Sequence, residues 1–286
     1  MSEIDLHTHS TASDGTFSPA ELIREAQDSG LKAVALTDHD TTKGLQEIIR
    51  AGKNADVEAI PGCELSVNYP TGQMHIVGLW LPEHPEHVQS QLQYLRDRRH
   101  SRNERILQKL QAIGIQMDYS EVKELAGDAS IGRPHIARLL MEKNYVPTVQ
   151  EAFDKYIGPG GQAYVPKDKL DPEQAIEVLK QEGATVILAH PYSLEISYQE
   201  LRSEVQRLQG LGLDGMEVYY TEHTREQTRE YLQICRELGL LASGGSDFHG
   251  SVKPDVKLGS GKGNLDIPYS LLQEMKEYRK RSGLWT

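Results

Sequence analysis

The chain has 286 residues, 38% of them hydrophobic and 26% charged, which predicts an ordinary globular protein with a sizeable core. The net charge of −11 argues against broad binding of duplex nucleic acid, and no apolar run approaches the ~20 residues that span a bilayer. The first residues show no secretory signal, and two cysteines suit a reduced, cytoplasmic protein.

Seven short apolar runs alternate with helical patterns along the chain. The runs span residues 4–6, 33–37, 57–62, 75–81, 185–190, 215–220 and 240–245. They are rich in Val, Ile, Leu and Ala, as buried strands are. Amphipathic helices are predicted over 18–30, 171–183 and 225–239, each ending at a glycine. This alternation predicts a parallel α/β architecture, closed or nearly closed into a barrel, with an open doubly wound sheet as the alternative.

The segment from His84 to Ala163 interrupts this alternation, because it contains no convincing strand. A long helix is predicted over 86–114, followed by shorter helices over 133–143 and 149–157. We therefore expect a small helical domain, residues 84–163, inserted into a barrel formed by residues 1–83 and 164–286. Such insertions are a common place for substrate selection.

Nine side chains of the kind that bind metals lie at or near the ends of the predicted strands. They are His7, His9, Asp14, His39, Glu64, His75, His190, Asp247 and His249. Residues two positions apart on a strand, such as His7 and His9, face the same way. The active sites of barrels lie where the strands end. One ion uses about four to six ligands, so nine predict two or three ions. Mixed imidazole and carboxylate ligands favour Mn, Fe or Zn, whereas Cys63 is expected to pack in the core.

Five motifs resemble those of one protein family. In chain order, "DLHTHSTASDGTFSP", "LTDHDT", "GCELS", "AHP" and "SDFHG" resemble the motifs of the polymerase and histidinol phosphatase (PHP) family of metal-dependent phosphoesterases. The resemblance implies a distorted, seven-stranded TIM-like barrel with three divalent ions, of which manganese is favoured. It implies three ligand sets: His7, His9, Glu64 and Asp247; Asp14, His39 and His249; and Glu64, His75 and His190, with Glu64 bridging.

The chemistry expected of such a site is hydrolysis of a phosphate ester. A metal-bridging hydroxide, held through Glu64, Asp247 and His249, would attack phosphorus in line while the ions stabilise the transition state. No motif for a serine or cysteine nucleophile is present. Asp5 shares a strand face with His7 and His9, and we expect it to accept a hydrogen bond from an imidazole rather than to bind metal.

Seven further residues are candidate substrate contacts. Arg133 and His135 begin a predicted helix, where free N–H groups favour phosphate, and the resemblance implies that this Arg-Pro-His turn holds one. A surface salt bridge is the alternative for Arg133. Arg99 and Arg102 lie on the polar middle turns of the long helix, where a solvated face is the alternative. Tyr219 and His223 follow the sixth strand together with Tyr220, and any of these three could line the pocket, with simple packing as the alternative.

The function predicted from these features is hydrolysis of phosphate monoesters of nucleotides, such as 3′,5′-bisphosphorylated nucleosides or AMP, with short oligonucleotides as further substrates. Histidinol-phosphate hydrolysis is the first alternative. A non-catalytic, metal-binding regulatory module is the second, although a complete ligand set argues against it. No duplex nucleic acid or membrane partner is expected, and the protein is predicted to be a cytoplasmic monomer.

Overall fold

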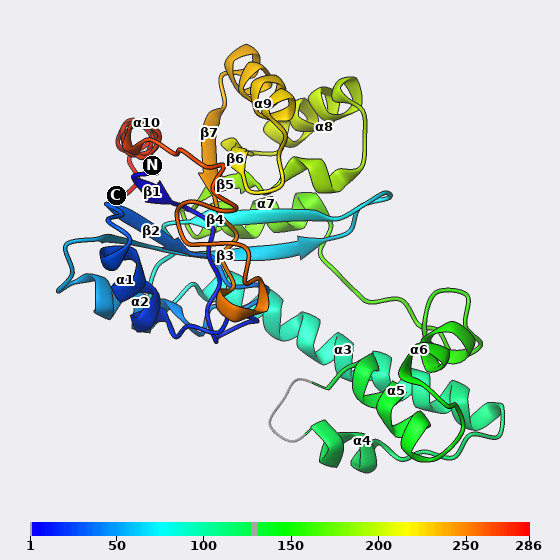
Figure 1. The fold of residues 1–286 in the computed structure, drawn as a ribbon. Helices are drawn as coiled ribbons and strands as arrows, with labels where there is room; N and C mark the ends of the chain where they lie inside the picture. The colour runs from blue at the N-terminus through cyan, green and yellow to red at the C-terminus, as the bar shows by residue number, and fades with distance from the viewer. Residues whose placement is uncertain (1, 127–130) are drawn as a thin grey trace. The chain divides into compact units, whose positions relative to one another are not determined.

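The computed structural model describes residues 2–126 and 131–286, and it contains a nearly closed seven-stranded barrel (Figure 1). The strands, paired in chain order, are β1 (Ile4–Asp5), β2 (Ala33–Leu36), β3 (Glu58–Val67), β4 (Met74–Leu79), β5 (Thr185–Leu188), β6 (Gly215–Tyr220) and β7 (Leu241–Gly245). Beyond the formal end of β1, Leu6 N–H donates to Gly244 O at 3.1 Å and Asp247 N–H donates to His7 O at 2.9 Å. These bonds bring the first and last strands together, and the predicted seven-stranded barrel is confirmed.

One strand runs against the others, so the prediction of a parallel sheet is wrong for β4. This strand pairs antiparallel with both β3 and β5, whereas the remaining pairs are parallel. Only residues 68–73 separate β3 from β4, and a parallel pair needs a crossover of about a dozen residues or more. The start of β4 therefore lies at the same end of the barrel as the ends of the parallel strands.

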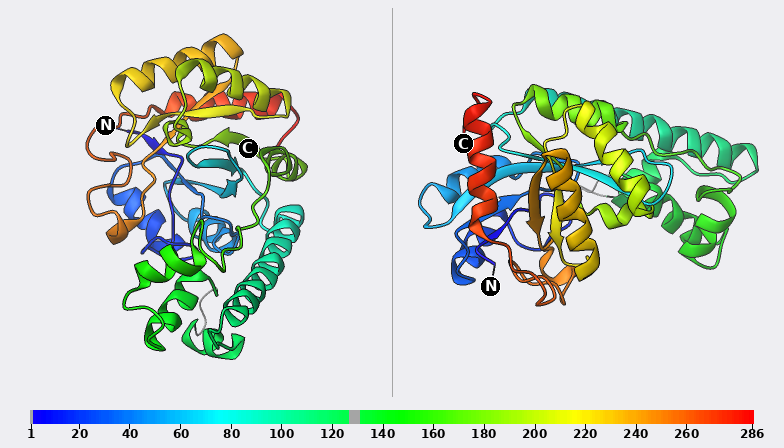
Figure 2. Two further views of the ribbon diagram at one scale, coloured as in Figure 1. Left: turned by 90° about the vertical axis from the view of Figure 1, so that its right-hand side faces the viewer. Right: turned by 90° about the horizontal axis from the view of Figure 1, so that it is seen from above.

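Helices cover the outside of the barrel (Figure 2). They are α1 (Pro19–Asp28), α2 (Leu45–Gly52), α7 (Pro172–Gln181), α8 (Tyr198–Gly210), α9 (Arg225–Leu238) and α10 (Tyr269–Arg281). Helix α1 begins where the Ser18 side chain accepts a hydrogen bond from Glu21 N–H, in a capping box. Its apolar face, which includes Leu22, packs with Val34 of β2. Two short 3₁₀ helices, Pro191–Leu194 and Gly250–Val252, follow β5 and β7.

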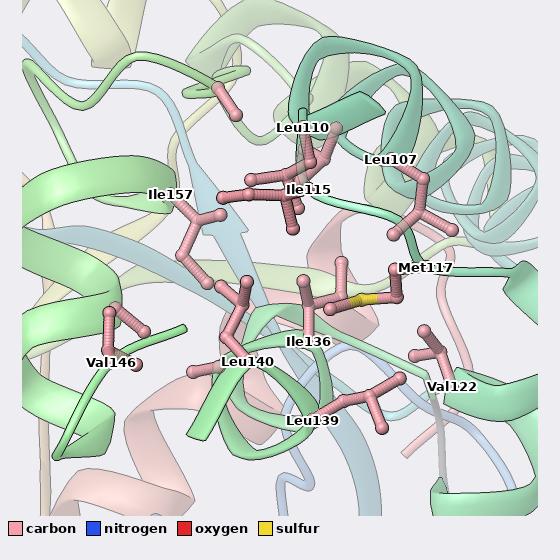
Figure 3. Packing of buried hydrophobic residues seen from close by; sticks show 14 of the residues in the cluster. Leu107, Leu110, Ile115, Met117, Val122, Ile136, Leu139, Leu140, Val146 and Ile157 are labelled. Atoms are coloured by element: carbon pink, nitrogen blue, oxygen red, sulfur yellow. The ribbon is translucent and has the colours of Figure 1, made fainter. Parts of the chain in front are cut away.

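The contacts divide the chain into two compact units, one of residues up to 92 with 170–286 and one of residues 93–169. The second unit is helical. Its elements are α3 (Glu86–Ala112), which begins in the first unit, α4 (Tyr119–Ala126), α5 (Arg133–Glu142), α6 (Val149–Ala152) and a π-helical turn (Phe153–Ile157). It has a core of its own, in which side chains such as Leu110, Ile136 and Leu140 pack together (Figure 3).

Both cysteines are free and buried. The Cys63 side chain is fully buried in β3, as expected for a core residue, and burial raises the pKa of its thiol. Among the described residues, no helix combines the length and the apolar character that crossing a bilayer requires.

Candidate metal centre

The nine predicted ligand residues come together at one end of the barrel. Their side chains form four overlapping groups, and within each group the potential ligand atoms all lie within 4.8 Å of one another. The groups are His9, Asp14, His39 and His249; His7, Glu64 and His190; His7, His9 and Asp247; and His39, Glu64 and His75. His75 joins them because β4 is antiparallel, so that its second residue lies beside the end of β3. The pairing of β2 with β3 continues beyond Leu36 as far as His39, which lies opposite Glu64.

Glu64 occupies the middle of this cluster and is completely buried. Its Oε1 lies 2.8 Å from His75 Nδ1 and 3.0 Å from His190 Nε2. Its Oε2 lies 2.8 Å from His39 Nδ1 and 3.3 Å from His7 Nε2. Burial alone would raise the pKa of Glu64, but the surrounding histidines hold that pKa well below its usual range. The residue lies within β3 rather than after it, because pairing with β4 extends β3 to Val67.

His7 and His9 face the same side of their strand, as the H-x-H spacing predicts. Their Nε2 atoms are 3.1 Å apart, and His9 Nε2 is 3.1 Å from Asp247 Oδ1. Burial opposes protonation of His7, but the carboxylates of Glu217 and Glu64 raise its pKa well above the usual value. Burial lowers the pKa of His9 to about 3, so its imidazole is neutral. Buried ring nitrogens this close require a shared proton or a cation between them.

His9, His39 and His249 form the side of the cluster that contains Asp14. The His9 ring is stacked on His39 and on His249, with centroids 4.3 and 4.1 Å apart. Asp14 Oδ1 lies 3.3 Å from His249 Nε2, and this interaction lowers the pKa of Asp14. The Asp14 side chain is 56% exposed, which gives this part of the cluster access to solvent.

Three buried atoms show that the cluster fits a metal. Within residues 2–126 and 131–286, His9 Nδ1, His39 Nδ1 and Glu64 Oε2 have no hydrogen-bond partner. The last two lie 2.8 Å apart but are not aligned for a hydrogen bond. A buried polar atom left unsatisfied costs about 1–3 kcal/mol, and divalent cations satisfy imidazole and carboxylate lone pairs together. A donor set of imidazoles and carboxylates without thiolate suits Mn, Fe or Zn.

The structure also shows interactions of Asp247 that the sequence did not indicate. Its Oδ2 accepts hydrogen bonds from the Tyr220 hydroxyl at 2.8 Å and from Lys253 Nζ at 2.6 Å. Burial would raise the pKa of Asp247, but the His9 hydrogen bond and the charge of His7 lower it well below its usual value. Oδ1 is therefore left to face His9 as an anionic oxygen.

The prediction for Asp5 is wrong, because its carboxylate bonds no imidazole among the residues that the structure describes. It accepts hydrogen bonds from Ser246 N–H at 2.9 Å, from the Ser246 hydroxyl at 2.5 Å and from Gly259 N–H at 2.7 Å. Asp5 therefore links β1 to the chain after β7. The carboxylate behind the His7 ring is that of Glu217, whose Oε1 lies 2.9 Å from His7 Nδ1.

A β-bulge in β6 decides which tyrosine faces the cluster. The register with β7 shifts between Glu217 and Tyr219, so Tyr220, rather than Tyr219, shares the inner face with Glu217. The Tyr220 ring centroid lies 5.3 Å from that of His190. Alternation along the strand directs Tyr219, named as a substrate contact from the sequence, away from the cluster.

His223 lies beside the cluster with two tyrosines. Its ring centroid is 5.1 Å from that of Tyr220 and 5.6 Å from that of Tyr192. Its Nδ1–H donates to Val218 O at 3.0 Å, while its buried Nε2 has no partner among the residues that the structure describes. Burial lowers the pKa of His223 to about 4, so the ring is neutral and Nε2 is an acceptor.

The predicted basic residues of the helical unit include a buried arginine. Arg102 is 4% exposed, and its Nε lacks a hydrogen-bond partner in the described part of the chain. Burial, followed by the charges of Arg133 and Arg99, lowers the pKa of Arg102. Arg133 Nη1 donates to Ile157 O at 3.2 Å, and His135 Nδ1 accepts from the backbone at the start of α5. Three guanidinium groups thus gather in this unit.

Comparison with known proteins gives consistent matches over most of the chain. The family model described as PHP domain matches residues 5–189. A 5′-3′ exoribonuclease of Haemophilus influenzae is 36% identical over 245 residues, covering 86% of this chain and 89% of that protein. A 3′,5′-nucleoside bisphosphate phosphatase of Chromobacterium violaceum is 31% identical over 250 residues, covering 87% of this chain and 88% of that protein. A solved amidohydrolase structure from Chromobacterium violaceum, with bound sulfate and no metal, has a TM-score of 0.70 at 29% identity. The match covers 96% of this chain and 97% of that chain.

Proposed function

The chain belongs to the PHP domain family, and from this premise we propose that it is a metal-dependent phosphoesterase acting on nucleotides. The proposed reaction is hydrolysis of phosphate monoesters such as those of 3′,5′-bisphosphorylated nucleosides or AMP, and of short oligonucleotides. The observation that carries the proposal is Glu64, a fully buried carboxylate whose two oxygens face imidazoles from four different segments.

We assign two to three divalent ions to the cluster, with manganese favoured. The proposed ligand sets are His7, His9, Glu64 and Asp247; Asp14, His39 and His249; and Glu64, His75 and His190. When bound, such ions neutralise phosphate oxygens and lower the pKa of water, which supplies a nucleophile at neutral pH. Glu64, Asp247 and His249 would hold the ions in place, while Tyr220 and Lys253 fix the orientation of the Asp247 carboxylate.

The aromatic residues beside the cluster support a nucleotide as the substrate. The Tyr192 ring is 37% exposed, and its centroid lies 5.6 Å from that of the buried Tyr220. An exposed tyrosine ring offers a stacking surface for a base. His223 adds a neutral acceptor that suits a hydroxyl or amino group of the substrate.

The helical unit is proposed to select the substrate through its basic residues. Among the described residues, the buried Arg102 Nε has no partner, and Arg133 and Arg99 add positive charge near it, which favours an anionic ligand. Arg99, Arg133 and His135 complete the proposed set of phosphate contacts. A substrate with a second phosphate would make use of them.

Product release from a panel of substrates tests the proposal, with phosphate measured for the monoesters and mononucleotides for the RNA. The panel contains a 3′,5′-bisphosphorylated nucleoside, AMP, histidinol phosphate and short 5′-phosphorylated RNA, each with Mn²⁺. We expect turnover of the nucleotides, its loss with EDTA or in Glu64→Gln, and its return when Mn²⁺ is added to the chelated wild type. A preference for histidinol phosphate would favour the first alternative. A metal-loaded protein without turnover on any substrate would contradict the proposal.

A further inference from the structure

We propose that Glu217 is a positioning residue that fixes the tautomer and orientation of His7, and the backbone beside His190, for metal binding. This inference rests on the proposed function, because it concerns the same metal centre. Sequence reasoning did not identify Glu217, and among the described residues it belongs to none of the groups of potential ligand atoms.

The two oxygens of Glu217 bind two different segments of the cluster. Oε1 lies 2.9 Å from His7 Nδ1, and Oε2 accepts a hydrogen bond from His190 N–H at 2.7 Å. Glu217 is only 3% exposed, so water does not compete for these oxygens. A single carboxylate on β6 therefore links the ends of β1 and β5, where two proposed ligands lie.

The hydrogen bond to His7 determines which ring nitrogen is free. When Nδ1–H donates to Glu217, the lone pair of a neutral imidazole is on Nε2. This Nε2 faces the cluster, 3.1 Å from His9 Nε2 and 3.3 Å from Glu64 Oε2. A carboxylate behind a ligating imidazole also makes that imidazole a stronger ligand.

The bond to His190 holds an unusual backbone conformation. His190 has φ 25°, a region that residues other than glycine rarely adopt. Such conformations persist when surrounding contacts impose them, and the bond from His190 N–H to Glu217 is one such contact. The Nε2 atom of His190 lies 3.0 Å from Glu64 Oε1. The carboxylate of Glu217 thus supports ligands on both sides of β6.

Glu217→Gln is the decisive variant, because an amide has one acceptor oxygen where the carboxylate has two. Either the His190 N–H loses its acceptor, or the amide donates toward His7 Nδ1 and moves the imidazole proton to Nε2. We expect about 10–100-fold weaker Mn²⁺ binding, the usual loss when such a supporting contact is removed. Competition with a chromophoric chelator measures this affinity without any substrate.

Asp214→Asn is the matched control. Asp214 directly precedes β6 and is also a buried carboxylate, but it binds Lys180 Nζ and Val186 N–H instead of a histidine. We expect it to lower stability and to leave Mn²⁺ affinity unchanged. If Glu217→Gln binds Mn²⁺ within about twofold of the wild type, the inference is wrong. If the wild type itself binds no divalent metal, the proposed function fails and this inference fails with it.

Nitrogen NMR of the Zn²⁺-loaded wild type provides a second test, which holds even if Glu217→Gln fails to fold. We expect the His7 ring to carry its proton on Nδ1 and to bind metal through Nε2. Metal bound to Nδ1 would overturn the inference. In Glu217→Gln, a shifted or broadened Nδ1 resonance is expected, whereas Asp214→Asn should reproduce the wild-type spectrum.

Discussion

The carboxylate of Asp38 accepts hydrogen bonds from both the backbone N–H and the hydroxyl of Ser10, each at 2.7 Å. The Ser13 hydroxyl adds a third hydrogen bond at 2.6 Å. Asp38 is 2% exposed and directly precedes His39, while Ser13 directly precedes Asp14. A single buried side chain therefore connects the loop after β1 to the chain after β2, and with it two proposed ligands of one ion.

Asp38→Asn should weaken the part of the metal centre formed by Asp14, His39 and His249. The asparagine amide has a single acceptor oxygen for three donors, so the loop after β1 loses its anchor. We expect at least tenfold weaker binding of one ion per chain, measured by Mn²⁺ titration and elemental analysis. Ser10→Ala, which removes only the hydroxyl bond among the three and touches no proposed ligand, serves as the control and should show a smaller loss. Unchanged stoichiometry and affinity in Asp38→Asn would show that the loop is held by other contacts.

His190→Ala tests the assignment of the third ion. Removing this imidazole leaves Glu64 Oε1 with His75 as its remaining partner, so that ion loses a ligand. We expect the loss of about one ion per chain and at least a 100-fold lower kcat, because the electrostatic stabilisation of the transition state is weakened. The exposed His87, changed to alanine, is the control. If both metal content and activity survive in His190→Ala, the assignment of the third ion is wrong.

The strands and the clustering of the proposed ligands were predictable from local patterns. Runs of apolar residues marked all seven strands, and His7 with His9 marked a shared strand face. The alternation of strands and helices does not give the direction of β4, whereas the six residues between β3 and β4, "NYPTGQ", are too few for a crossover. Periodicity shows that a residue lies in a strand, but only the length of the connection indicates the strand's direction.

The residues that support the ligands were not predictable, because their contacts join distant parts of the chain. Glu217 contacts His7, 210 residues earlier, and nothing local distinguishes it from an ordinary strand residue. The bulge that places Tyr220 instead of Tyr219 beside the cluster depends on pairing with β7, which sequence alternation does not show. The expectation for Asp5 fails because its oxygens bind Ser246 and Gly259, which follow it by 241 and 254 residues in the chain.

Arg279 should contribute strongly to stability and little to catalysis. Its guanidinium is fully buried and lies 4.8 and 5.5 Å from the ring centroids of the chain's two tryptophans, Trp80 and Trp285. It donates to Gly183 O at 3.0 Å and to Thr185 Oγ1 at 2.9 Å. Burial lowers its pKa to about 10, so it remains a cation at neutral pH.

Arg279→Met should reduce the free energy of unfolding by about 2–4 kcal/mol, because buried acceptors lose their donor. Urea unfolding followed by tryptophan fluorescence measures this directly, since both tryptophans flank the arginine. The exposed Arg281, changed to methionine, is the control and should stay within about 0.5 kcal/mol of the wild type. A similar stability for the two variants would contradict the expected role of Arg279.

His223 should make the folded protein less stable in mild acid. In the unfolded chain, His223 takes up a proton near the ordinary histidine pKa of about 6.5. In the folded protein, burial lowers the pKa of His223 to about 4. Between these values the unfolded state binds more protons, so stability is complete above pH 6.5 and falls as the pH drops toward 4. The full loss from this group is about 3 kcal/mol.

His223→Gln should therefore flatten the dependence of unfolding free energy on pH within this window, because glutamine does not titrate. Urea unfolding between pH 7 and 4.5, with EDTA present so that metal binding does not contribute, gives the slope for each protein. The exposed His87, changed to glutamine, should keep the wild-type slope. Equal slopes for wild type and His223→Gln would mean that the folded protein protonates His223 as readily as the unfolded chain does, and that its ring is not held neutral beside the metal centre.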